Sequence, residues 1–198
     1  MTFFAAAPKS SAMAPIKTPD RFGTLDPDFL LAIPDGDDRQ RRICRHCDFI
    51  DYDNPRIVVG SVVRHEGRIL LCRRAINPRM GFWTLPAGYL ETGETPAEGA
   101  MREAREEANA ALTISGVLAI YTIRRLGQVQ IMHRAQLADP AISAGAESLE
   151  VGLFAWEDIP WSGLAFPSVG WALNHDLAAE SGDAAMPYYN PAGEDGGM

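Results

Sequence analysis

Residues 88–110 read GYLETGETPAEGAMREAREEANA, and this stretch decides the fold. Thr95 can cap the N-terminus of a helix, Pro96 suits the first helical position, and Glu98 completes a capping box. Asn109 can adopt the left-handed conformation that closes a helix. The sequence therefore predicts a helix that begins after Thr95 and ends before Asn109.

The predicted helix carries Glu103, Glu106 and Glu107 on one face, because residues three and four positions apart are neighbours on a helix. Each close pair of like charges costs a helix ~0.2–0.5 kcal/mol unless something positive lies between them. The helix alone is equally consistent with a solvated acidic face and with a cation site.

The loop before the helix favours the cation site. It contains Pro86, Gly88 and Gly93, so its backbone can turn tightly and present carbonyl and amide groups to a ligand. Carbonyl oxygens beside three carboxylates form the all-oxygen ligand set that Mg²⁺ or Mn²⁺ requires. Metal held in this way suits phosphoryl or pyrophosphate chemistry.

The arrangement of Gly88, five residues, Glu94, seven residues and then REAREE at 102–107 resembles the Nudix box. The one departure from that pattern is Asn109, where the family has glycine. Asparagine tolerates the left-handed conformation, so the helix end is expected to survive the change.

A wider resemblance spans roughly residues 33–180. It rests on IPDGD at 33–37, YDNP at 52–55, VVG at 58–60 and WTLPAGY at 83–89. These stretches are similar to a Nudix subfamily with an N-terminal zinc-ribbon segment, which includes the plant FAD pyrophosphatases and members that hydrolyse ADP-ribose. The resemblance implies an α/β fold, the Nudix α/β/α sandwich with a mixed β-sheet, plus an irregular N-terminal segment.

The resemblance also implies roles for single residues. Mg²⁺ or Mn²⁺ would be bound by the carboxylates of Glu103, Glu106 and Glu107 and by the backbone carbonyl of Ala87. Glu94 and Arg102 would pair and orient the helix, as residues behind metal ligands do.

Two groups of carboxylates are candidates for the general base. Glu106 and Glu107 belong to the box, whereas Glu147 and Glu150 lie in a later segment just before a predicted strand. In some family members a box glutamate is the base, and in others a glutamate from a later loop. A base has to reach the attacking water at hydrogen-bond distance, which a sequence does not reveal.

The expected reaction is metal-dependent hydrolysis of the pyrophosphate bond in a nucleoside diphosphate linked to another group. The substrate would be FAD, giving FMN and AMP, or ADP-ribose, giving AMP and ribose 5-phosphate. One alternative is an NADH pyrophosphatase, although IPWSGLAFP at 159–167 does not match the motif of those enzymes. Another is a non-catalytic Nudix-fold nucleotide sensor, which would usually have lost the box carboxylates.

Candidate substrate-binding residues are two arginines and several aromatic residues. Arg73 and Arg74 could meet phosphates, but side chains alternate along a strand, so only one of them is expected to face the site. Trp83, Tyr89 or Tyr121 could stack on a base, although aromatic residues in strands belong to the core more often than to a site.

Hydrophobic patterning predicts a mostly β domain with a second helix. Strands are expected at 56–65, 68–73, 82–85, 112–124, 128–137 and 151–156, and a final helix at 168–179. We expect a disordered tail at 1–27, a degenerate zinc-ribbon-like segment at 28–55, the Nudix hydrolase domain at 56–180, and a disordered tail at 181–198.

The cysteines determine whether the zinc-ribbon-like segment can bind zinc. Cys44 and Cys47 have zinc-knuckle spacing, but a structural zinc site needs four ligands, and residues 1–43 contain no cysteine or histidine. Cys72 lies on a predicted strand and is expected to be a core residue. We therefore predict that the cysteine pair is a remnant without zinc.

Composition limits the partners. The formal net charge is −8, which disfavours nucleic acid as a partner, because a phosphate backbone needs a basic surface. No apolar run is long enough to span a membrane. The expected partner is a small dinucleotide substrate, the expected location is the cytoplasm, and the chain could form a homodimer.

Overall fold

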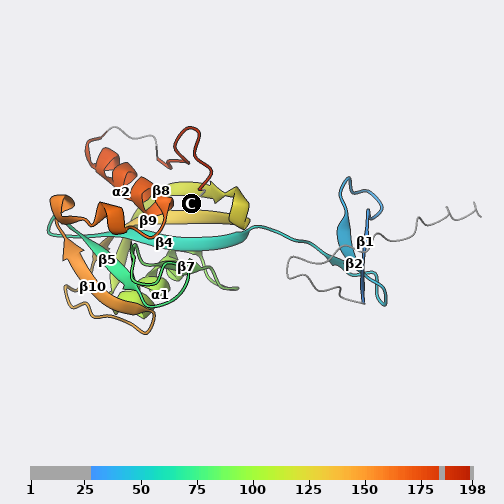
Figure 1. The fold of residues 1–198 in the computed structure, drawn as a ribbon, viewed down its shortest axis with the longest axis horizontal. Coiled ribbons are helices and arrows are strands. Elements are labelled where there is room, and N and C mark those ends of the chain that lie inside the picture. Colours follow the sequence, from blue (N-terminus) through green and yellow to red (C-terminus); the bar gives the residue numbers. More distant parts are fainter. Residues whose placement is uncertain (1–27, 183–185, 197–198) are drawn as a thin grey trace, which may run out of the picture. The chain divides into compact units, whose positions relative to one another are not determined.

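A computed structural model describes residues 28–182 and 186–196 of this chain (Figure 1). The predicted tail at residues 1–27 lies outside the described residues. The chain divides into two compact units, with the boundary between Asn54 and Pro55.

The first unit contains a small antiparallel sheet with the strand order β1-β2-β3. Its strands are β1 (Phe29–Ala32), β2 (Arg41–Cys44) and β3 (Ile50–Asp51). The sequence predicted an irregular segment here. The strands were missed because they have two to four residues each, which is too short for an alternating pattern to stand out.

The second unit is built on a seven-stranded mixed sheet. The main path runs β10-β5-β4-β9-β8, while β6 pairs with β5 and β7 pairs with β4. Strands β4 and β9 are parallel, and the remaining pairs are antiparallel. The strands are β4 (Arg56–His65), β5 (Arg68–Arg74), β6 (Trp83–Thr84), β7 (Ala87–Tyr89), β8 (Leu112–Ile123), β9 (Gln128–Leu137) and β10 (Ser148–Phe154).

Two helices, α1 (Pro96–Ala108) and α2 (Pro167–Glu180), cover opposite faces of this sheet (Figure 1). Neighbouring residues of the same strand alternate between two core clusters, as Val62 and Val63 do. One cluster lies under α2 and includes Leu173, whereas the other lies under α1 and includes alanines of that helix. The predicted α/β/α sandwich is therefore confirmed.

Helix α1 begins and ends as the sequence predicted. The Thr95 side chain accepts a hydrogen bond from the Glu98 N–H, and the Glu98 carboxylate accepts one from the Thr95 N–H, so the capping box is complete. Asn109 closes the helix in the left-handed conformation, with φ 49°. These caps fix the helix that carries the glutamates.

Strand β7 was not predicted, because PAG at 86–88 was interpreted as part of a loop. It pairs with β4, where Gly88 lies opposite Val59 and Ala87 lies opposite Gly60. A Cβ atom at Gly60 would come within 2.8 Å of the Pro86 carbonyl oxygen, so this pairing needs a glycine there. The glycine loop is thus held against the sheet.

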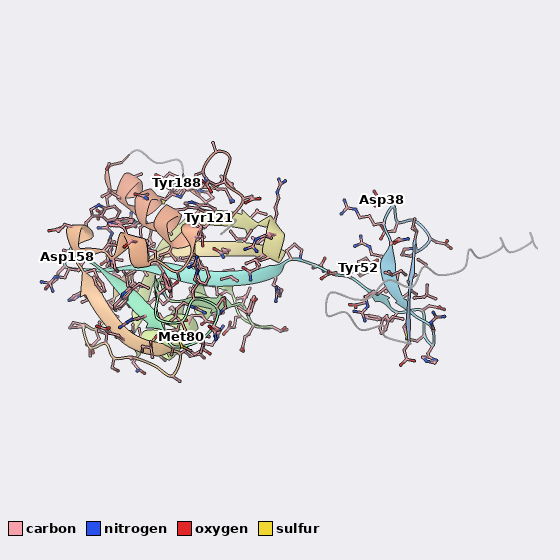
Figure 2. All side chains as sticks on the ribbon, in the orientation of Figure 1. Asp38, Tyr52, Met80, Tyr121, Asp158 and Tyr188 are labelled. Carbon is pink, nitrogen blue, oxygen red and sulfur yellow. The ribbon has the colours of Figure 1, made fainter. Side chains whose placement is uncertain are left out.

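Residues 186–196, which belong to the tail predicted at 181–198, make contacts with the second unit. Tyr188 exchanges backbone hydrogen bonds of 2.8 Å with Leu118 and Ile120 of β8. Tyr188 and Tyr121 both lie beside α2 (Figure 2). The Tyr188 ring stacks on that of His175 in α2, at a centroid distance of 4.5 Å, and His175 also contacts the Tyr121 hydroxyl at 2.8 Å. The segment therefore packs as part of the second unit.

Candidate active site

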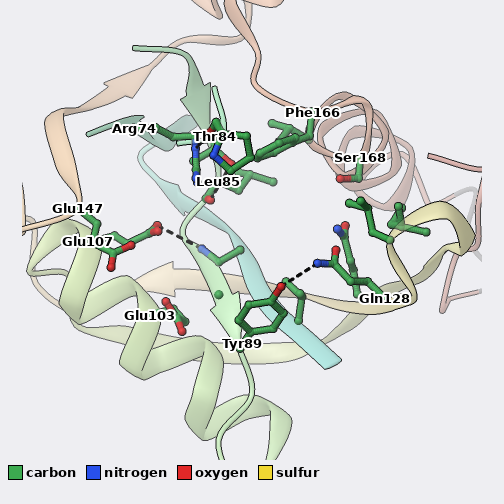
Figure 3. Close-up of a pocket in the computed structure, with 18 of the residues that line it drawn as sticks. Arg74, Thr84, Leu85, Tyr89, Glu103, Glu107, Gln128, Glu147, Phe166 and Ser168 are labelled. Carbon is green, nitrogen blue, oxygen red and sulfur yellow. Dashed lines mark hydrogen bonds between the residues drawn. The ribbon is translucent and has the colours of Figure 1, made fainter. Parts of the chain in front are cut away.

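A cavity of about 1140 Å³ opens in the second unit, between the glycine loop with α1 and the beginning of α2 (Figure 3). Glu103, Glu106 and Glu107 line it from α1, and Ala87 and Gly88 line it from β7. The box residues that the sequence singled out as metal ligands are thus gathered around one space.

Glu107 and Glu103 are nearly buried, with 6% and 8% of their surface exposed. Burial raises the pKa of Glu107 to about 8, and the nearby carboxylates of Glu103 and Glu147 act in the same direction. The backbone N–H of Ala87 opposes this shift by donating to Glu107 Oε2 at 3.2 Å. Burial likewise raises the pKa of Glu103. Such a group of buried acids calls for a positive charge.

Gly88 makes room for this group. A Cβ atom at position 88 would overlap the carboxylate of Glu103. The absence of a side chain therefore lets the helix carboxylate lie directly against the backbone of β7.

Arg102 organises the acids around it. Its guanidinium donates to both carboxylate oxygens of Glu94, at 2.7 and 3.1 Å, so the expected Glu94–Arg102 pair is present. It also donates to Glu103 at 2.7 Å, to Glu106 at 3.1 Å and to the Tyr89 carbonyl at 2.9 Å. Arg102 thus connects the loop to the helix and partly neutralises the carboxylates of Glu103 and Glu106.

The fit of a divalent cation can be judged from these donors. Within residues 28–182 and 186–196, no three histidine, cysteine or acidic side chains already stand close enough to hold one ion. The carboxylates of Glu103 and Glu107 nevertheless line the same cavity as Ala87, and burial opposes the charged form of both acids. The donors are all oxygen atoms and the site favours positive charge, so the residues fit Mg²⁺ or Mn²⁺.

The two later glutamates have different positions. Glu147 lines the cavity and lies close enough to Glu103 and Glu107 to raise the pKa of both. Glu150 does not line the cavity, and its carboxylate lies 3.4 Å from the Arg73 guanidinium. Of these two candidate bases, Glu147 lies beside the box carboxylates, whereas Glu150 lies in β10, which already begins at Ser148.

The loop that carries Glu147 is attached to the end of α1. The side-chain amide of Asn109 donates to the Ser143 carbonyl at 3.1 Å and to its hydroxyl at 3.0 Å. The N–H of Gly145 donates to the Glu107 carbonyl at 3.0 Å. A Cβ atom at Gly145 would overlap the Glu106 carbonyl, so the loop lies directly on the helix.

The predicted substrate residues separate into two groups. Arg74 and Tyr89 line the cavity, and the Tyr89 hydroxyl accepts a hydrogen bond of 3.1 Å from Gln128 (Figure 3). Arg73, in contrast, pairs with Glu150 outside the cavity, as strand alternation requires. Of the two candidate arginines, Arg74 is thus the one that faces the cavity.

Two aromatic candidates belong to the core. Trp83 packs edge-on against Phe154, with ring centroids 4.8 Å apart, and does not line the cavity. Tyr121 is fully buried. Both rings therefore pack with the core, which the sequence analysis gives as the more frequent position for aromatic residues in strands.

The sequence analysis did not identify several residues that line the cavity. Gln128 and Gln130 line the cavity from β9, Phe166 and Ser168 from the start of α2, and Gly196 from the C-terminal segment. No local pattern marks these residues, because distant segments bring them together.

The cysteine pair lies in the first unit. Cys44 ends β2, Cys47 is exposed, and the Nε2 atom of His46 lies 3.2 Å from Asp28. In the described part of this unit, no third ligand joins the two cysteines. The residues present therefore do not fit a four-ligand zinc site. Cys72 is buried in the second unit, as expected.

No helix in the described ranges is both long and apolar enough to cross a membrane.

Comparison with known families agrees with this geometry. The NUDIX domain model matches residues 54–162, and a zinc-ribbon model described as Nudix N-terminal matches residues 28–53. The first match includes α1 and all seven strands of the larger sheet. The second match covers the small three-stranded unit.

Two curated relatives are similar over part of the chain. A MutT-like protein of Streptomyces ambofaciens is 33% identical over 102 residues, which are 52% of this chain and 64% of the relative. An ADP-ribose pyrophosphatase of Methanocaldococcus jannaschii is 27% identical over 113 residues, which are 55% of this chain and 67% of the relative. The chain thus spans about two thirds of the length of each.

Among solved structures, a Nudix hydrolase from Nitrosomonas europaea is 39% identical with a TM-score of 0.74. The match covers 88% of this chain and 97% of that protein. Because the NUDIX domain model covers more than half of the chain and this structural relative covers nearly all of it, the chain belongs to the Nudix hydrolase family.

Proposed function

We propose that this protein hydrolyses the pyrophosphate bond of a nucleoside diphosphate linked to another group, with ADP-ribose or FAD as substrate. The observation that carries the proposal is the group of buried box carboxylates, which line one cavity behind the side-chain-free position of Gly88. AMP would be one product, together with ribose 5-phosphate or FMN.

Mg²⁺ or Mn²⁺ would be held by Glu103, Glu106, Glu107 and the carbonyl of Ala87. When bound, the cation supplies positive charge that stabilises the pyrophosphate oxygens and lowers the pKa of a nearby water. Arg102 already contacts two of these carboxylates, so its pairing with Glu94 would keep it beside them as a fixed positive group.

The remaining roles follow from the lining of the cavity. Glu147 lies beside the box carboxylates on a loop attached to α1, so we propose it as the base that accepts a proton from the attacking water. Glu106 and Glu107 are then ligands rather than bases. Arg74 would bind a phosphate oxygen of the substrate, because it is the arginine that β5 turns towards the cavity.

The choice of substrate has two supports of different kinds. The similarity to the archaeal ADP-ribose pyrophosphatase favours ADP-ribose. The flanking stretches that resemble the plant enzymes favour FAD. A screen of ADP-ribose, FAD and NADH with Mg²⁺ or Mn²⁺, with the products identified, decides between them.

The mechanism is tested with Glu103→Gln, Glu107→Gln and Glu147→Gln. The first two should lower hydrolysis by about 10²-fold or more and weaken metal binding, because each removes a charged ligand. Glu147→Gln should lower kcat by about 10²–10⁴-fold, the usual contribution of a general base, while metal affinity stays close to that of the wild type. Rates near those of the wild type in Glu103→Gln and Glu107→Gln would rule out the metal site.

A further inference from the structure

The cavity extends from the box carboxylates to the hairpin that joins β8 to β9. Ile123 and Gln128 are paired across this hairpin, and both line the cavity. Arg125 and Leu126, in the turn between them, line it as well. We call the part of the cavity at these four residues the hairpin end. Gln128 lies on the side away from Glu107 (Figure 3), so the hairpin end is remote from the proposed metal ligands.

Segment 186–196 runs along β8, which is the outer strand of the sheet at this side. The outer edge of such a strand presents backbone groups that no neighbouring strand satisfies. The Tyr188 N–H donates to the Leu118 carbonyl, and the Tyr188 carbonyl accepts from the Ile120 N–H, both at 2.8 Å. Tyr188 and Ala119 thereby form a parallel bridge. The segment thus continues the sheet beside β8.

Asn190 continues this pairing with its side chain instead of its backbone. Its Oδ1 accepts from the Thr122 N–H at 2.8 Å, and its Nδ2 donates to the Thr122 carbonyl at 3.0 Å. The same Nδ2 donates to the Glu194 carbonyl at 3.1 Å, and the Glu194 N–H donates to the Pro191 carbonyl at 3.0 Å. One amide therefore holds both β8 and the turn at 191–194.

After this turn, Gly196 lies at the hairpin end. It is buried, it lines the cavity and its φ is 79°. A Cβ atom at position 196 would lie 2.4 Å from Ile123 Cδ1 and 2.9 Å from Ile123 Cγ2, so the glycine backbone lies directly on that side chain. The cavity wall beside Ile123 is therefore formed by a segment that is distant in the sequence.

The lining of the hairpin end fits a flat heteroaromatic ring. Leu126 and Val169 offer apolar surface, and Gln128 and Gln130 offer amide groups. Heteroaromatic rings have apolar faces and polar edges, so a site of this composition contacts both parts of the ring. In the proposed substrates, the rings remote from the pyrophosphate are the nucleobase and the flavin of FAD.

We propose that segment 186–196 is a specificity determinant: it forms the cavity wall beside Ile123 and limits the size of the ring bound at the hairpin end. Asn190 is a positioning residue, because it does not line the cavity but holds the segment against β8. The inference rests on the proposed function, since it concerns the substrate of that same site.

The test compares wild-type protein with Asn190→Ala and with a chain that lacks residues 186–198. The first variant loses the side-chain contacts of Asn190, and the second loses the wall itself. Asn174→Ala is the matched control, because its amide donates to the Gly170 carbonyl at 2.8 Å, at an exposed position outside the cavity. Hydrogen exchange at residues 118–123 reports the release of the segment and should be faster in both test variants.

Two series of substrates separate the two rings. ADP-glucose, GDP-glucose and UDP-glucose differ only in the base, whereas ADP-ribose and FAD differ only in the second group. In both test variants, discrimination by kcat/KM within one series should weaken about tenfold, since one methylene in a pocket already changes selectivity by ~10–200-fold. The change should be in KM, because the metal ligands lie at the other end. The series that changes identifies the ring.

Unchanged discrimination in both series, with the segment released, would overturn the inference. So would a fall in kcat for every substrate at constant KM, which indicates a purely structural role. Unchanged hydrogen exchange in Asn190→Ala would overturn the role of Asn190, and the deletion then tests the wall. If wild-type protein hydrolyses none of the substrates, the proposed function fails. Calorimetry with Mg²⁺ then measures the same discrimination as binding affinities, so the two failures remain distinguishable.

Discussion

Glu107 shows how a single carboxylate can make stability depend on pH. Its pKa rises from an ordinary value of 4.5 to about 8, mainly through burial. Between these two values the folded protein keeps a proton that the unfolded chain releases. The contribution of Glu107 to the free energy of unfolding is therefore largest below pH 4.5, and it decreases as the pH rises to 8.

Glu107→Gln should remove this dependence, because glutamine stays neutral. In EDTA at pH 9 the variant should be more stable to urea than the wild type, and at pH 4.5 the difference should vanish. The wild-type free energy of unfolding should lose up to ~1.4 kcal/mol per pH unit relative to the variant. Glu106→Gln, which changes an exposed residue of the same helix, should follow the wild type. A pH-independent difference between Glu107→Gln and the wild type would contradict the assignment.

At the scale of elements, the end of α1 both closes the helix and holds the loop of Glu147. Glycine at this position would allow the left-handed conformation, but it could not donate the two side-chain hydrogen bonds to Ser143. Asn109 does both. The departure from the family pattern thus adds a contact between the metal helix and the proposed base.

Asn109→Gly should therefore lower kcat several-fold with little change in KM, since Glu147 loses its fixed position while the cavity stays open. It should also lower the free energy of unfolding by ~1 kcal/mol, the net contribution of a typical hydrogen bond. Asn109→Ala should lose a further ~1–2 kcal/mol, because alanine is strained in the left-handed region. Steady-state kinetics and urea unfolding measure both effects. An unchanged kcat in Asn109→Gly would show that the loop keeps its position without the amide.

Helix α2 is held to the sheet by a buried charge network. The Asp176 carboxylate is fully buried and accepts from Arg64 Nε at 2.5 Å and from Arg134 Nε at 2.6 Å. Asp176→Ala would leave the charges of Arg64 and Arg134 without this buried carboxylate. The free energy of unfolding should therefore fall by ~3–5 kcal/mol. Urea unfolding checks the value, with Glu157→Ala on an exposed turn as the control. A loss of unfolding free energy in Asp176→Ala no larger than that in Glu157→Ala would contradict the prediction.

Local patterns predicted the elements that have strong local causes. The capping box and Asn109 defined α1, and β-branched runs defined β4 and β5. Strand β7 was missed because its pairing with β4 depends on a close approach between Gly60 and Pro86. Glu150 was expected before the strand but lies in it, because β10 begins three residues earlier than its apolar pattern suggests. These errors share one cause: contacts between distant segments decide them.

At the scale of the whole molecule, the C-terminal segment shows the same limit. Its Asn190 side chain exchanges hydrogen bonds of 2.8 and 3.0 Å with the backbone of Thr122, and buried Gly196 lies against Ile123. The composition of residues 181–198, rich in glycine and small residues, predicted disorder instead. Backbone partners leave no pattern in a sequence, so only the fold could reveal this docking.

The first unit leads to a prediction about metal content. Arg41 pairs with Asp37 at 2.9 Å and its guanidinium lies 5.2 Å from the Tyr52 ring centroid, so ionic and aromatic contacts hold the small sheet. We expect purified protein to contain far less than one zinc per chain by elemental analysis, and its unfolding to be insensitive to a zinc chelator. Stoichiometric zinc would show that further ligands complete the Cys44–Cys47 pair.

The overlap of a Cβ atom at Gly88 with Glu103 also has an evolutionary consequence. Every single-nucleotide change in a glycine codon that alters the amino acid introduces a side chain. No such substitution can leave the carboxylate of Glu103 where it is, so we expect no single substitution at position 88 to be neutral. Active descendants of this chain can vary its substrate pocket while this position stays fixed.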